Sequence, residues 1–144
     1  MATGNTAPQF SNKPQNGLTN GITAANTNLD GTGTVGTDIF EVFVSAATYG
    51  SYLQSIVVSP RGTNVATVLR VFLNNGATNA TASNNAKIAE ITLPATTASA
   101  VAALQSYEVP INCAIAPGYR ILVTIGTAVA GGYAVTGFGG DYTP

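Results

Sequence analysis

The sequence contains no histidine and no tryptophan, and it has a single cysteine, Cys113. Without histidine, a Ser-His-Asp or Cys-His nucleophile system is excluded, and so is a catalytic zinc site built on histidines. One cysteine excludes a disulfide and any cysteine-based metal site within the chain. Cys113 lies between Ile111 and Ile115 in an apolar stretch. Because free cysteine behaves as a small hydrophobe, we expect it to be buried.

Charged residues are also scarce, at 8% of the 144 residues, compared with about 25% in typical domains. The five basic side chains form no cluster that could neutralise a row of phosphates, so nucleic-acid binding is not expected. The six carboxylates are scattered and form no catalytic motif; they are Asp30, Asp38, Glu41, Glu90, Glu108 and Asp141. A carboxylate pair brought together by the fold and a calcium site stay open as alternatives. We predict a protein without enzymatic activity, catalytic residues, bound metal or cofactor.

Long apolar runs and targeting signals are missing as well. No apolar run reaches the roughly 18 residues that a membrane helix needs. The first residues, Met-Ala-Thr-Gly-Asn-Thr, show neither the basic region nor the apolar region of a signal peptide. We therefore expect no membrane partner, and we expect the protein to be made in the cytoplasm of its cell and released there.

Residues 1–29 differ in composition from the rest of the chain. They contain six asparagines, five threonines, three glycines and two prolines, and they show neither a helical nor a strand period. Such a segment cannot build its own core. Phe10, Leu18 and Ile22 are isolated large apolar residues within it. We predict a flexible, extended N-terminal arm over 1–29, with these three residues as candidate anchors on a partner.

Residues 30–144 read as short strands separated by turns. Hydrophobic residues make up 45% of the chain and glycine numbers 16, which is typical of strands joined by tight turns. Pro110 indicates an edge strand, since proline cannot donate to a sheet ladder. Seven segments are rich in β-formers: 37–44, 52–58, 65–73, 87–93, 107–111, 119–125 and 133–138.

This spacing, without crossover helices, predicts an all-β antiparallel sandwich that is jelly-roll-like, with an immunoglobulin-like sandwich as the alternative. The segments 39–44 and 121–125 are apolar on both faces. Both faces of such strands must be buried. We therefore expect a homo-oligomer, a dimer or trimer, in which a subunit interface covers the second face.

Two patterns suggest binding chemistry on first inspection. Residues 31–36 match G-x-G-x-x-G, but a dinucleotide site requires a strand before the motif and a helix after it, and here a polar coil precedes and a strand follows. A hinge between arm and sandwich explains these glycines better. Six tyrosines could form a stacking platform for carbohydrate, although tyrosines more often lie at the edges of cores and interfaces.

Several stretches resemble a family of small virion proteins of tailed bacteriophages. The most distinctive is Gly62 to Gly76, GTNVATVLRVFLNNG, and the likeness extends over roughly residues 29–142. Ile91 to Ser99, Pro117 to Val123 and Ala134 to Tyr142 also look like that family. These are strand-and-turn patterns, not a catalytic signature.

The family is similar to head decoration (cement) proteins. The resemblance implies a structural protein of the virion that binds the outer capsid surface and bridges neighbouring major capsid proteins, with many copies sharing the load. It would be located on the capsid after assembly in the bacterial cytoplasm. Two alternatives stay open: a tail or fibre-attachment component, and a carbohydrate-binding module that uses the tyrosines.

Overall fold

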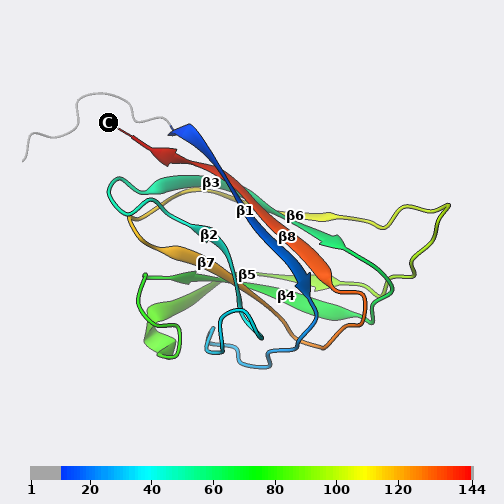
Figure 1. Ribbon diagram of the computed structural model, residues 1–144. Helices are drawn as coiled ribbons and strands as arrows, with labels where there is room; N and C mark the ends of the chain where they lie inside the picture. Colours follow the sequence, from blue (N-terminus) through cyan, green and yellow to red (C-terminus); the bar gives the residue numbers. More distant parts are fainter. Residues whose placement is uncertain (1–10, 144) are drawn as a thin grey trace, which may run out of the picture.

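The computed structural model describes residues 11–143, which form two antiparallel four-stranded sheets and no α-helix (Figure 1). Sheet A has the strand order β1-β8-β3-β6 and sheet B the order β2-β7-β4-β5. The predicted all-β antiparallel sandwich is confirmed. The strands are β1 (Ser11–Ile22), β2 (Phe40–Val44), β3 (Ser51–Pro60), β4 (Thr67–Asn74), β5 (Asn85–Leu93), β6 (Tyr107–Ile115), β7 (Arg120–Ile125) and β8 (Tyr133–Tyr142). A single 3₁₀ turn, η1 (Ala82–Asn84), precedes β5.

The main core lies between the two sheets and comes from the inward side chains of the strands. Leu53, Ile56 and Val58 of β3 are fully buried there. They belong to one cluster with Leu69 of β4 and Val123 of β7. The strand predicted around Pro110 is indeed an edge strand, because β6 is the outermost strand of sheet A.

The predicted boundary of the arm at residue 29 is wrong for residues 11–22. They form β1, which pairs antiparallel with β8 over its whole length and is the other edge strand of sheet A. The sequence pattern does not predict this strand, because its inward positions carry Gln15, Gly17 and Thr19. Without apolar side chains at alternate positions, the sequence lacks the period of two that marks a half-buried strand.

The segment between β1 and β2, residues 23–39, packs over β7 and β4 on the outer face of sheet B (Figure 1). The amide of Asn26 donates to the carbonyl oxygen of Ile125 at 2.8 Å. Ile39 from this segment forms a second buried cluster with Phe72 of β4 and Leu122 of β7. The expectation that a subunit interface covers the two-sided apolar strand 121–125 is therefore wrong, because the chain covers that strand itself. The predicted glycine hinge is part of this covering segment.

The β1–β2 edge of the sandwich is closed by close contact. Gln15 Nε2 donates to the carbonyl oxygen of Val44 at 2.7 Å, and Thr19 Oγ1 donates to that of Glu41 at 3.0 Å. A Cβ atom on Gly17 would overlap the carbonyl oxygen of Val42. Glycine at this position therefore lets the edge strands of the two sheets touch.

Replacing Gly17 with alanine is expected to lower the free energy of unfolding by about 3 kcal/mol, the upper end of the range for an overpacked interior. The added methyl group must push β1 away from β2, because the atom it meets belongs to backbone. Urea unfolding curves would measure the loss. Asn16→Ala, at an exposed position on the same strand, is the control and should change stability by less than about 0.5 kcal/mol. Equal midpoints for the two variants would contradict the close packing.

Candidate functional site

The outer face of sheet A is the first candidate surface, and residues 11–143 leave it uncovered. The strand register places Leu18 beside Thr136, Thr136 beside Val57, and Val57 beside Glu108. Leu18 is 80% exposed, and Phe138 on β8 is 39% exposed. We name the surface formed by these five residues the sheet A face. Four of the five residues are uncharged, and exposed apolar side chains that gather on one face mark an interaction site.

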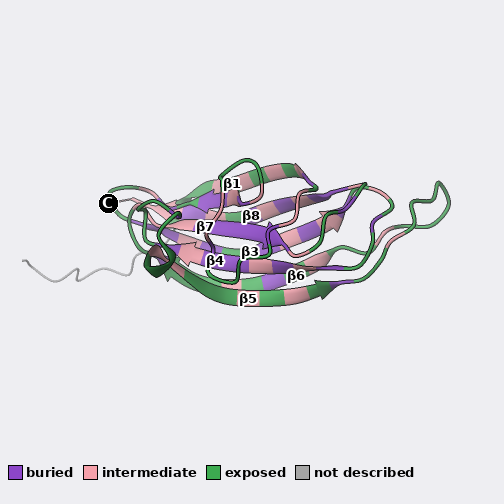
Figure 2. Cartoon of the chain, turned by 90° about the horizontal axis from the view of Figure 1, so that it is seen from below, coloured by how far each residue is buried: buried purple, intermediate pink, exposed green. Residues whose placement is uncertain are grey.

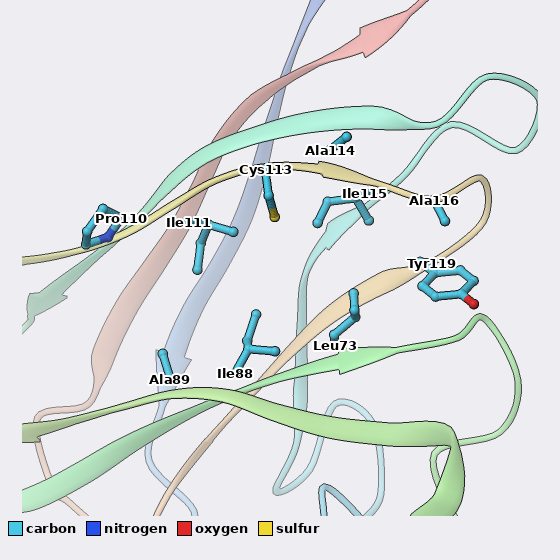
Figure 3. A pocket seen from close by; sticks show the side chains of 10 residues that line it. All are labelled: Leu73, Ile88, Ala89, Pro110, Ile111, Cys113, Ala114, Ile115, Ala116 and Tyr119. Carbon is cyan, nitrogen blue, oxygen red and sulfur yellow. The ribbon is translucent and has the colours of Figure 1, made fainter.

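A cleft between the edges of β5 and β6 is the second candidate surface. It has a volume of about 350 Å³ and an apolar lining. Figure 3 shows Ile111, Cys113 and Ile115 of β6 pointing toward Ile88 of β5. Figure 2 shows β5 as a largely exposed strand beside the buried strands of its sheet. The sandwich is thus closed along β1 and β2, and hollowed along β5 and β6.

Irregularities in both edge strands position the cleft side chains. In β5, Val71 pairs with Ala89 and Phe72 with Lys87, which leaves Ile88 as an extra, bulged residue. In β6, Asn112 adopts a positive φ of 49° where the pairing with β3 shifts. Such bulges bend an edge strand and re-aim its side chains. They direct Ile88 from one sheet and the residues around Asn112 from the other into the same space.

Cys113 is exposed at this cleft, so the prediction of a buried cysteine is wrong. Its neighbours Ile111 and Ile115 are more buried than it is. The apolar sequence around it suggested a core strand, but β6 is an edge strand that has a bulge at this point. A side chain on such a strand has a sheet on one side and open space on the other.

The three candidate anchors do not lie together. Leu18 projects from the sheet A face, and Phe10 lies outside the described residues. Ile22 is fully buried in the core of its own chain, so it is not available to a partner. Gly21, with a φ of 79°, and a register shift at the end of β1 turn Ile22 inward. Composition alone could not find the other residues of the two surfaces, because strand facing depends on these irregularities.

Three groups among the described residues have a pKa that departs clearly from its ordinary value. A hydrogen bond from Lys87 holds the pKa of Glu90 below its usual value, with a further contribution from Arg70. Hydrogen bonds from the hydroxyl and amide of Thr32 lower the pKa of Asp30. Burial raises the pKa of Tyr133. Each shift has a local structural cause, and none of these groups belongs to either candidate surface.

Comparison with protein-family models, with curated proteins and with solved structures gives no match. Among residues 11–143, no group of three or more His, Cys, Asp or Glu side chains is placed to hold a metal ion. Within the same range, no helix has the length and apolar character needed to cross a bilayer. A functional proposal therefore depends on the fold, the two surfaces and the sequence patterns.

Proposed function

We propose that this protein is a structural virion protein without enzymatic activity, a decoration (cement) protein on the head of a tailed bacteriophage. Its partner is the major capsid protein, and its role is to bridge neighbouring copies on the outer capsid surface. The observation that carries the proposal is the uncovered sheet A face, where Leu18 and Phe138 are exposed beside few charges. The likeness of residues 62–76 to phage virion proteins agrees with it.

The strand order supports the finer assignment of the fold as a jelly roll. β1 pairs with β8, β2 with β7, β3 with β6 and β4 with β5. This is the pairing of one long antiparallel ribbon, and the pairs β3·β8 and β4·β7 fold that ribbon over into two sheets. Jelly rolls of eight strands occur in viral capsid domains and also in lectins. The topology therefore agrees with a virion role and equally with carbohydrate binding.

Binding through the sheet A face fits a load-sharing role. A rigid sheet presents its side chains in a fixed arrangement, so little conformational entropy is lost when they meet a partner. Many copies on one particle add their contacts, so that each single contact can be modest.

Quantitative mass spectrometry of purified phage particles would test the proposal. We expect the protein in the virion, with a copy number in a simple ratio to that of the major capsid protein. A copy number that matches the tail or fibre symmetry would replace the capsid role with the tail-attachment alternative. Absence from particles, together with binding to a glycan array, would replace it with carbohydrate recognition.

A further inference from the structure

The cleft between β5 and β6 is apolar surface that the described chain leaves empty. Ile88 is 43% exposed, and the thiol of Cys113 is accessible. The side chains lining the cleft carry no charge. Burying such surface is favourable in proportion to the apolar area removed from water. The cleft therefore suits an uncharged, apolar group.

The size of the cleft restricts what can fill it. At about 350 Å³ it lies at the lower end of the range of about 300–1,000 Å³ for pockets that bind small molecules. One aromatic side chain with its neighbouring backbone is of suitable size, whereas a helix or a second strand is too large.

Residues 1–10 of the chain itself supply such a group. Their sequence, Met-Ala-Thr-Gly-Asn-Thr-Ala-Pro-Gln-Phe, has no charged side chain and one aromatic residue. That residue, Phe10, directly precedes β1. Pro8 lies two positions before it, and proline limits the conformations that a docking segment must give up.

Phe10 cannot reach the cleft of its own chain while β1 stays paired. Ser11 lies beside Tyr142 of β8, at one edge of sheet A, and β6 is the opposite edge. Three strand spacings of about 4.8 Å separate the two edges, a span of about 14 Å. The Cα of Phe10 lies only about 3.8 Å from that of Ser11. An aromatic side chain does not cover the remaining distance.

We propose that the cleft between β5 and β6 binds Phe10 of a second copy of this chain. Each copy then donates one N-terminal segment and receives one. Reciprocal exchange between two copies closes a dimer, and exchange in one direction around a ring closes a higher cyclic oligomer. The inference does not depend on the capsid role, because it concerns the protein in solution.

The single cysteine gives a direct readout of cleft occupancy. We expect the alkylation rate of Cys113 by a small maleimide to fall as protein concentration rises. At a total concentration about ten times the dissociation constant of a dimer, about one fifth of the clefts stay free, so the rate should be about fivefold slower. Phe10→Ala should react at the fast rate throughout. Slow reaction of Phe10→Ala, or a wild-type rate independent of concentration, would overturn the proposal.

Mixing two variants separates exchange between copies from docking within one chain. The receptor is Phe10→Ala, whose cleft is intact. The donor carries Ile88→Asp, which blocks its own cleft, and Cys113→Ser, so that only the receptor thiol reacts. We expect added donor to slow alkylation of the receptor. The same donor with Phe10→Ala as a third change should have no effect, and protection by it would contradict the role of Phe10.

Val65→Asp is the matched control for Ile88→Asp. Val65 is an exposed valine before β4, and it lies six residues before Val71, whose partner Ala89 lines the cleft. Because six residues of extended chain span about 20 Å, the control should associate as the wild type does in sedimentation velocity, whereas Ile88→Asp alone should associate more weakly. Equal association of both variants would rule out the cleft as the contact. Association with an unprotected Cys113 would place the contact elsewhere and also contradict the proposal.

Discussion

Deletion of residues 1–29 is expected to abolish cooperative folding, whereas deletion of residues 1–10 is expected to leave the sandwich intact. The longer deletion removes β1, which pairs along β8 and closes the sandwich against β2. It also removes Ile22, a fully buried member of the main core. The shorter deletion stops before the first residue of β1.

The expected loss is large compared with the stability of a domain of this size. Removing a buried isoleucine side chain alone costs about 2–5 kcal/mol, and total stabilities are about 5–15 kcal/mol. The loss of β1 adds the hydrogen bonds of a whole strand ladder. It also leaves β8 as a bare edge, which invites pairing with other chains.

Thermal unfolding followed by circular dichroism, together with the soluble yield, would measure both truncations. We expect the 30–144 fragment to be insoluble or to lack a cooperative transition. The 11–144 fragment should unfold at nearly the midpoint of the full chain. A soluble 30–144 fragment with a cooperative transition of β type would mean that β1 is an accessory strand and not part of the folding unit.

Seven of the eight strands could be predicted from sequence because their buried faces carry Val, Ile, Leu or Phe. β1 could not be predicted, because its inward residues are small or polar. They allow β1 to pack closely against β2 and bury little apolar area. Gly17 gives room for the Val42 carbonyl group, and Gln15 bonds to β2. Contacts of this kind depend on a strand that is more than twenty residues away, which no local pattern contains.

The two surfaces could be predicted only in part, for a related reason. Leu18 could be predicted as a candidate contact residue because it is an isolated apolar residue in a polar segment, and it is exposed. Phe138 and Val57 looked like any other strand residue, because the sequence does not say which face of a sheet stays uncovered. That depends on residues 23–39 packing over sheet B and leaving sheet A bare. The cleft likewise depends on two bulges that shift the strand register.

Replacing Leu18 with aspartate is expected to weaken binding to capsids that lack the protein by about 100-fold or more. Burying a leucine side chain contributes about 1.5–3 kcal/mol, and each 1.4 kcal/mol is about tenfold in affinity. Aspartate loses this contribution and adds a charge that must be desolvated in the interface. Leu18→Ala, which introduces no charge, should weaken binding by about tenfold.

The position suits such a test because Leu18 is 80% exposed on the sheet A face, so folding should change by less than about 0.5 kcal/mol. Val101→Asp is the control: Val101 is 96% exposed and lies in the loop between β5 and β6. Titration of capsids with each variant, measured by co-sedimentation, would give the affinities. We expect the control to saturate capsids as the wild type does. Unchanged occupancy with Leu18→Asp would mean that the capsid binds a different face, because burying an unpaired charge in an apolar contact weakens binding.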